Sequence, residues 1–296
     1  MAGASLLALL DDIATLLDDI AVLSKVAAKK TAGVLGDDLA VNAEQVSGVR
    51  AERELPVVWA VAKGSLLNKL ILVPAALLMS LYAPWLITPV LMLGGIYLCF
   101  EGAEKLHEWI VHKPKDSTAA DRLSHLRLSK DDLLALENVK IKGAIRTDFV
   151  LSAEIVVIIL GSVANTSFSN QVIVVSGLAV LFTLAVYGLV AAIVKMDDVG
   201  LYLVEAEYAG HKGRFSGWVG RGLINAAAPL MHTLSVLGTF AMFLVGGGIL
   251  SHGWLWLHHW VEPLSSLGTG FANTIIGVIT GLLVLLIVMA IKKLRS

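Results

Sequence analysis

Cysteine and charge are both scarce in this sequence. A single cysteine, Cys99, excludes an intramolecular disulfide framework, and its apolar neighbours indicate a packing role. Charged residues make up 16% of the 296 residues, whereas soluble domains carry about 25%. The formal net charge of −1 gives no argument for a nucleic-acid partner.

Motifs that mark the common enzymes and pumps are missing as well. Without a Walker loop the chain is not expected to be a nucleotide-driven pump, and without HExxH or GxSxG it has no ordinary protease or lipase site. No cluster of Cys and His suggests haem or iron–sulfur binding. We therefore expect neither an enzyme nor a resident cofactor.

A basic amino-terminal region is absent too. No Lys or Arg precedes Lys25, and no small-residue cleavage site follows a short apolar core, so a cleaved signal peptide is not expected. Apolar residues, by contrast, form 56% of the chain and gather in long blocks. Because about 20 apolar residues span a bilayer, the sequence predicts an all-α polytopic membrane protein with about six transmembrane helices. The expected spans are 64–83, 86–106, 147–164, 171–194, 222–250 and 270–291.

The connections between these spans differ in basic charge. Nine Lys or Arg residues lie within 105–146, others follow the fourth span, and the carboxyl-terminal tail is basic. The alternate connections, at 84–85, 165–170 and 251–269, contain none. The positive-inside rule therefore predicts that both flanks of the six-span core are cytoplasmic. The first two of these short connections also predict helical hairpins.

The first helix carries four aspartates in an otherwise aliphatic run. At about 100° per residue they share one face, opposite leucines and isoleucines. They are Asp11, Asp12, Asp18 and Asp19. No basic residue stands three or four positions away, where a helical partner would. We expect this N-terminal amphipathic acidic region, 1–60, to pack against a transmembrane bundle, 61–296, and to turn its aspartates toward a polar interior or a cytoplasmic vestibule. The bundle would include a basic, helical cytoplasmic loop at 105–146.

Three further acids lie within or at the edge of expected spans. Glu154 is surrounded by Val, Ile and Leu, about 9 Å deeper than Asp148 at about 1.5 Å per helical residue. Because a carboxylate at that depth is costly unless paired or hydrated, Glu154 should face the bundle interior or a water-filled cavity. Asp148 sits in the first turn of its span, where the helix dipole favours an acid. Glu101 has the spacing to pair with Lys105, which competes with a functional role.

The fifth and sixth spans hold the remaining candidates. Asn225, Pro229 and His232 share one face of the fifth span, where His232 could carry a proton or simply bond a neighbouring helix. Gly277 and Gly281 form a GxxxG face suited to close packing within the chain or in a homo-oligomer.

The 251–269 connection is rich in residue types that bind zinc. These are His252, His258, His259 and Glu262. Because the adjacent His258 and His259 would point to different faces of a helix or strand, we favour a loop anchored by interfacial tryptophans over a metal site.

Several segments echo one another weakly and suggest an internal, inverted repeat. The spacing of Asp12 and Asp18 matches that of Asp148 and Glu154. Glycine and proline interruptions at corresponding positions of two halves are typical of a transporter's central site. The other matched segments are WAVAKGSLLN (59–68) with WVGRGLIN (218–225), MLGGIYL (92–98) with VGGGIL (245–250), and GDDLAVNAE (36–44) with MDDVGLYLVEAE (196–207).

Longer stretches carry a family resemblance. The run from LLDDIATLLDD to VVWAVAKGS (9–65), LMLGGIYLCFEGAEKL (91–106) and IKGAIRTDFVLSAEI (141–155) resemble the bacterial YedI-type inner-membrane family. That resemblance covers most of the chain and implies a bacterial inner-membrane location, but supplies no activity and no site. FVLSAE and LGGIYL with a nearby acid are similar to the TerC and LysE-like cation exporters, which hold acidic residues at a cation site within their spans.

Two functions fit these observations. The first is a secondary transporter or exporter of a cation, because intramembrane carboxylates and broken helices are typical of such proteins. Its acidic, hydrated route would comprise Asp11, Asp12, Asp18, Asp19, Asp148 and Glu154, with Asn225 and His232 lining it. The second is a non-transporting inner-membrane scaffold or stress-response partner, in which the basic loop and the first helix dock proteins or lipid headgroups.

Overall fold

A computed structural model describes residues 2–46, 53–111, 130–208, 214–261 and 264–295. Regular structure in these ranges is helical throughout, which confirms the all-α class. The elements are α1 (Ala2–Val46), α2 (Glu54–Tyr82), the short 3₁₀ helix η2 (Pro84–Leu86), α3 (Ile87–Val111), α5 (Lys130–Ser162), α6 (Phe168–Val194), α7 (Met196–Tyr208), α8 (Arg214–Gly253), α9 (Leu255–Val261) and α10 (Ser266–Arg295).

Within the described residues, five helical segments are long and apolar enough to cross a membrane. They are 54–82, 84–110, 168–194, 215–253 and 266–294. Four of them contain an expected span, and 54–82 covers all of 64–83 but its last residue. The remaining expected span, 147–164, begins inside α5 and ends just past it. This part of α5 does not qualify by composition because Arg146, Asp148 and Glu154 interrupt it, yet it packs against α1, α2 and α6 within the bundle. The chain is thus an all-α polytopic membrane protein.

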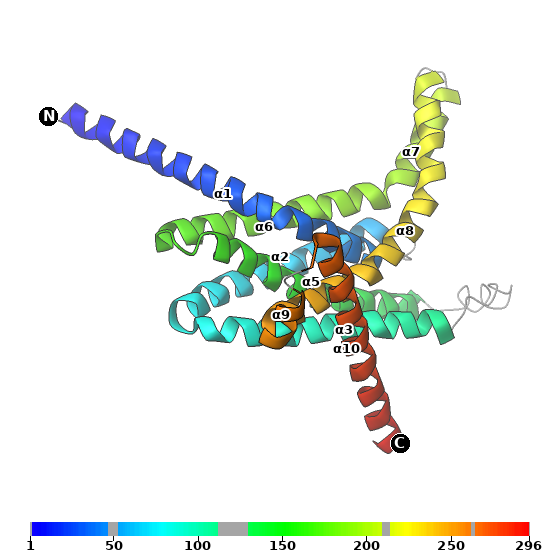
Figure 1. The fold of residues 1–296 in the computed structure, drawn as a ribbon. Coiled ribbons are helices and arrows are strands. Elements are labelled where there is room, and N and C mark those ends of the chain that lie inside the picture. The colour runs from blue at the N-terminus through cyan, green and yellow to red at the C-terminus, as the bar shows by residue number, and fades with distance from the viewer. Residues whose placement is uncertain (1, 47–52, 112–129, 209–213, 262–263, 296) are drawn as a thin grey trace.

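The two expected hairpins are present. Figure 1 shows α2, α3, α5 and α6 running alongside one another, with tight turns joining α2 to α3 and α5 to α6. The first turn begins at Ala83, whose N–H donates to the carbonyl of Met79 at 2.8 Å, and Pro84 follows as the first residue of η2. In the second turn, the Oγ atom of Ser167 accepts from the Asn170 N–H and caps α6. These local signals place the helices antiparallel.

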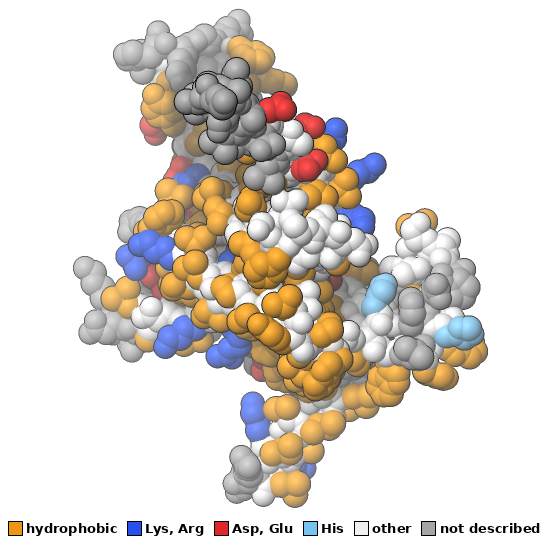
Figure 2. Space-filling model, turned by 90° about the vertical axis from the view of Figure 1, so that its left-hand side faces the viewer, with side chains coloured by type: hydrophobic (Ala, Val, Ile, Leu, Met, Phe, Trp, Pro, Cys, Tyr) orange, Lys and Arg blue, Asp and Glu red, His pale blue; other side chains and the backbone are white. Residues whose placement is uncertain are grey.

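Much of the outer surface is apolar, as lipid contact requires. Large exposed side chains on α2 and α6 include Leu67, Leu70, Ile71 and Leu184. Figure 2, which views the molecule from the side of the two hairpins, shows hydrophobic side chains over much of this face. A lipid-facing surface as apolar as the core is typical of membrane bundles.

The helix α1 belongs to two environments. Its first part projects away from the other helices in Figure 1, and Leu17 and Val22 are exposed there. Its second part, from Ala27 to Val46, packs against α5, α6 and α8 and supplies buried residues of the core. The second part of α1 therefore contributes to the core of the bundle, and the division of the chain near residue 60 stays a prediction.

Glycines let α3, α8 and α10 approach one another closely. A Cβ atom on Gly95 would lie 3.0 Å from the carbonyl oxygen of Gly246, and one on Gly246 would lie 2.8 Å from that of Gly95, so α3 and α8 cross at this pair. Side chains at Gly277 and Gly281 would collide with the backbone of Phe243 and of Cys99. The predicted GxxxG face is thus occupied by packing within the chain, which leaves its role in a homo-oligomer a prediction.

Candidate functional site

Seven polar side chains meet inside the bundle, at the contact of α1, α2, α5 and α6. We call this group the Asp148 cluster, since every member bonds either Asp148 or one of its partners. The members are Asn42 from α1, Ser65, Asn68 and Lys69 from α2, Asp148 and Ser152 from α5, and Tyr187 from α6. All seven are buried.

Both carboxyl oxygens of Asp148 are saturated. Oδ1 accepts from the Ser65 hydroxyl at 2.8 Å and from the Tyr187 hydroxyl at 2.9 Å. Oδ2 accepts from the Asn68 amide at 3.0 Å and from the Ser152 hydroxyl at 3.2 Å. A carboxylate has acceptor capacity only, so these donors match its chemistry and fix its position. The carboxyl group is only 2% exposed, and this cage is what makes its burial tolerable.

Lys69 supplies the opposite charge. Its ammonium nitrogen lies 3.9 Å from Oδ1 of Asp148 and donates to the hydroxyls of Ser65 at 2.9 Å and Ser152 at 2.7 Å. Each serine accepts from the lysine and donates to the aspartate, so two hydroxyl bridges join the ion pair. Buried charges persist only when they are paired and hydrogen-bonded in this way.

Tyr187 connects the ion pair to α1. Its hydroxyl lies 2.9 Å from Asp148 Oδ1 and 2.9 Å from Asn42 Oδ1. The Asn42 amide nitrogen donates to the Asp38 carbonyl at 2.9 Å, which turns its oxygen toward the tyrosine. A phenol has one proton, so Tyr187 serves one of these two acceptors at a time.

Two carboxyl oxygens are buried without any hydrogen-bond partner among the described residues. They are Oδ1 of Asp38 on α1 and Oε2 of Glu154 on α5. The two carboxyl groups, together with Asp37, lie close enough to repel each other when ionised. An unpaired buried carboxylate is costly. A proton or a cation bound at these two oxygens would therefore stabilise them.

A cavity of about 410 Å³ lies next to these acids. Its polar lining comes from five helices and includes Asp37, Thr88, Glu154, His252 and Asn273; the rest is apolar. On its far wall the Ser251 hydroxyl donates to Asn273 Oδ1 at 2.8 Å, which holds α8 against α10. The expectation that Glu154 faces the bundle interior is met by this position.

Glu101 forms a second, separate network. Its carboxylate accepts from the Gln45 amide at 2.5 Å and from the Thr147 hydroxyl at 2.6 Å. The Lys105 that sequence spacing assigned to it pairs instead with Glu44 on α1. The i,i+4 partner is displaced because α1 brings an acid to the lysine from another helix.

The structure does not bring the other predicted residues to this site. Asp11, Asp18 and Asp19 are exposed on the projecting part of α1, and the side chain of Asp12 lies outside the described ones. Asn225 and His232 are exposed on α8. Helix α8 meets α1 and α3 through glycines, with Gly238 against the α1 backbone and Gly246 against that of α3, and its exposed faces carry Asn225 and His232.

The zinc-binding residue types of the 251–269 segment do not converge either. His252 lines the cavity and His259 is exposed, while Glu262 and the side chain of His258 lie outside what the structure describes. Among the described residues, no group of three or more His, Cys, Asp or Glu side chains is arranged to hold a metal ion.

Sequence reasoning missed Lys69 and Asp38, although a signal existed for each. Lys69 lies inside the first expected span, and a basic residue at such a position is a functional hypothesis by default. Asp38 opens the segment DLAVNAE (38–44), which is identical to DFVLSAE (148–154) at three of seven places. The sequence analysis had matched the spacing of Asp148 and Glu154 to that of Asp12 and Asp18 instead, and the repeat stays a prediction.

Comparisons with known proteins show a family but no activity. Searches of the curated proteins and of the solved structures found no match to the chain. One family profile, described as "Protein of unknown function (DUF808)", matches residues 4–292, nearly the whole chain. The chain, an all-α membrane protein, therefore belongs to the DUF808 family.

Proposed function

We propose that this protein is a secondary transporter that moves a cation, in the simplest case a proton, by way of its buried carboxyl groups. The observation that carries the proposal is the pair of carboxyl oxygens without hydrogen-bond partners, Asp38 Oδ1 and Glu154 Oε2, of which Glu154 lines a cavity. Intramembrane acids that face a cavity mark ion pathways in pumps and transporters.

Glu154 is the group through which the cation enters. It lines the cavity, so an ion or proton that reaches the cavity meets its carboxylate first. Asp38, on α1, is the next acid that the cation reaches, because its charge interacts with those of both Glu154 and Asp148 on α5. A bound cation offsets the repulsion between these acids, and the repulsion returns when the cation is released.

The Asp148 cluster is the fixed counterpart of this movable charge. The ion pair of Asp148 with Lys69 keeps a permanent dipole in the core. Through its hydroxyl, Tyr187 links Asp148 to Asn42 on α1, so a change at the ion pair reaches α1. When the Tyr187 proton changes from one acceptor to the other, the contact between α1 and α5 changes with it. A two-position bond of this kind is suited to couple ion binding to helix movement.

Flux measurements test the proposal. The full chain is reconstituted into liposomes with an internal pH dye, and the decay of an imposed pH gradient is followed in Na⁺ and in K⁺ buffers. We expect decay faster than in protein-free vesicles and a return to the protein-free rate for Glu154→Gln. Asp18→Asn, which neutralises an exposed acid, is the matched control and should keep the native rate.

Two results would contradict the proposal. One is a native protein indistinguishable from empty vesicles under every gradient applied. The other is a folded Glu154→Gln variant with the native rate.

A second candidate function rests on the projecting part of α1. Its exposed acids stand beside exposed apolar residues, among them Leu17 and Val22, and such a surface suits docking of a protein partner. A scaffold of this kind requires the projecting part and tolerates neutral residues at Glu154. Deleting residues 2–20 separates the two functions, because transport through the bundle should survive the deletion and docking should not.

We further propose a bacterial inner-membrane location with the α2–α3 and α5–α6 turns outside the cytoplasm, from the distribution of basic residues. Cys99 is buried, so an added cysteine can be labelled with little background. An impermeant maleimide should label Ser167→Cys in intact cells, and Lys293→Cys only after lysis. The reverse pattern would overturn this orientation.

A further inference from the structure

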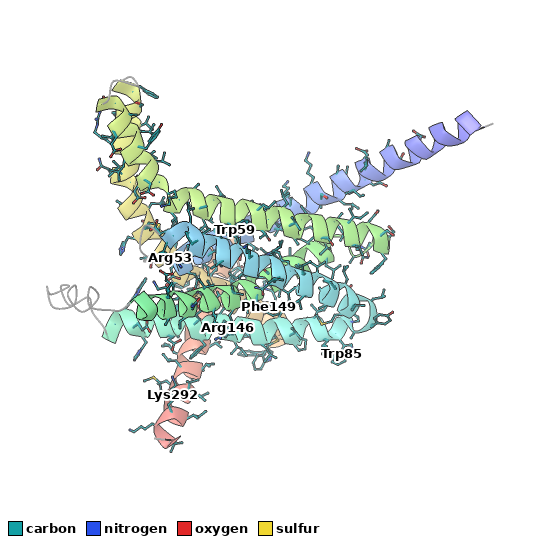
Figure 3. The ribbon with its side chains drawn as sticks, turned by 180° about the vertical axis from the view of Figure 1, so that it is seen from behind. Arg53, Trp59, Trp85, Arg146, Phe149 and Lys292 are labelled. Carbon is teal, nitrogen blue, oxygen red and sulfur yellow. The ribbon has the colours of Figure 1, made fainter. Side chains whose placement is uncertain are left out.

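A second hollow lies on the outside of the bundle, between α2 and α6. Its volume is about 480 Å³, within the range of about 300–1,000 Å³ typical of small-molecule sites. Trp59, Ala62 and Leu66 line it from α2, and Leu184, Gly188 and Ala191 line it from α6. Figure 3 labels Trp59 where α2 runs beside α6. We call this hollow the α2–α6 groove.

The walls of the groove are suited to an aliphatic chain. Trp59, Leu66 and Leu184 are exposed although they are large and apolar, and both helices are long enough to cross a membrane. Leu55 and Val58 continue the apolar wall toward the start of α2. In a membrane protein such a groove opens to lipid and not to water.

The rim of the groove carries one charge, and that charge is positive. Lys63 lines the groove, and its ammonium nitrogen lies 5.2 Å from the centre of the Trp59 ring. In the part of the chain that the structure describes, no acid lies within ion-pair distance of Lys63. Glu54, at the start of the same helix, is engaged by Lys195 at 3.9 Å. The groove therefore offers an uncompensated cation next to a Trp, a residue typical of the membrane interface.

We propose that the α2–α6 groove binds one acyl chain of an anionic phospholipid, whose phosphate lies at Lys63. Charge complementarity selects the anionic lipid, because a zwitterionic headgroup brings its own cation to the lysine. The apolar walls hold the chain, and Trp59 covers it from the side of α2.

The bound chain would touch the Asp148 cluster from outside. The inner wall of the groove is formed by Thr183 and Tyr187. Tyr187 is the residue whose hydroxyl serves both Asp148 and Asn42, so a chain packed on its ring restrains the position of that hydroxyl. Lipid occupancy is thereby linked to the buried site, although lipid binding itself does not depend on transport.

Quenching of Trp59 tests the proposal. The full chain is placed in liposomes of phosphatidylcholine that contain a minor share of phosphatidylglycerol, with bromine on the chains of one lipid or the other. The contribution of Trp59 is the difference between the native protein and Trp59→Phe. We expect phosphatidylglycerol to quench Trp59 more than the same share of brominated phosphatidylcholine, and Lys63→Gln to abolish this preference.

A glycine pair supplies the matched variants. A Cβ atom on Gly188, in the groove, or on Gly177, outside it on the same helix, would meet no atom within 4 Å, so both positions accept a side chain without a collision at its Cβ. Gly188→Phe should fill the groove and remove the excess quenching, while Gly177→Phe should leave it unchanged. Equal quenching by both lipids, excess quenching that survives Gly188→Phe, or a preference retained by Lys63→Gln would overturn the proposal.

Discussion

The segments 38–44 of α1 and 148–154 of α5 share a sequence pattern and differ in their partners. Each begins with Asp, has a small polar residue at the fifth place and ends in Ala-Glu. In α5 the aspartate is saturated and Oε2 of Glu154 has no hydrogen-bond partner. In α1 the reverse holds, because Glu44 pairs with Lys105 while Oδ1 of Asp38 has no partner.

The difference arises from the neighbouring helices and not from the segments themselves. Helix α2 brings Lys69 with a serine and an amide to Asp148, while α3 brings Lys105 to Glu44. Each segment therefore contains one acid with a carboxyl oxygen that has no hydrogen-bond partner. We call these two acids, Asp38 and Glu154, the reserve acids, and they interact across the contact of α1 with α5. Two related segments with opposite partners are what a repeat in two alternating states would contain. The repeat itself stays a prediction.

Removing the counter-charge of Asp148 should have the largest effect on stability. Lys69→Met leaves Asp148 buried without its counter-charge, and removing one member of a buried ion pair costs about 3–5 kcal/mol. A lowered melting temperature in detergent would measure it. Lys142→Met, which removes an exposed lysine from α5, is the control and should melt as the native protein does. Combining Lys69→Met with Asp148→Asn should recover part of the loss, and an additive loss would contradict the pairing.

Removing the tyrosine hydroxyl should have the next largest effect. Tyr187→Phe takes one donor from Asp148 and leaves Oδ1 of Asn42 without it, which costs about 1–3 kcal/mol. In the comparison, this variant removes one of the four hydrogen-bond donors that distinguish Asp148 from Asp38. Thermal unfolding with and without Asn42→Ala measures the coupling; independent effects of the two substitutions would show that the bridge carries no energy.

The reserve acids should respond in the opposite sense. Asp38→Asn and Glu154→Gln remove a buried charge that no hydrogen bond supports, so the melting temperature should stay unchanged or rise. Asp148→Asn should lower it, because an amide group presents donors to donors. If all three substitutions destabilise the protein equally, the distinction between saturated and reserve acids is wrong.

The smallest effect is expected at the acids that look most conspicuous in the sequence. Asp18→Asn and Asp19→Asn change exposed side chains, and such substitutions alter stability by no more than about 0.5 kcal/mol. The same melting assay checks this. A loss as large as that of Tyr187→Phe would mean that these aspartates have partners in the membrane-bound protein.

The helices and part of the candidate site could be predicted from the sequence. Apolar length predicted six spans, five of which correspond to long apolar helices in the described residues. Turn chemistry predicted two hairpins, and the depth of Glu154 predicted its inward position. The rotation of each helix could not be predicted, because lipid is as apolar as the core and periodicity does not separate the two faces. For that reason Asn225 and His232 were placed inward, whereas the structure turns them outward.

The partners of the acids were beyond reach for a different reason. Lys69 and Asp148 are far apart in the sequence, and no local pattern shows that α2 and α5 will meet. The four aspartates of the first helix were a strong local signal with a simpler physical meaning, since acids that lack partners within a helix are most stable in water.

The unbroken length of α1 has a mechanical consequence. One continuous helix carries both Asp38, inside the bundle, and the aspartates outside it. Because α1 is one continuous helix, a rotation that changes the surroundings of Asp38 also turns the projecting end. A spin label at Thr15, on the projecting end, would therefore report a rotation of the buried part of α1 from a position outside the bundle.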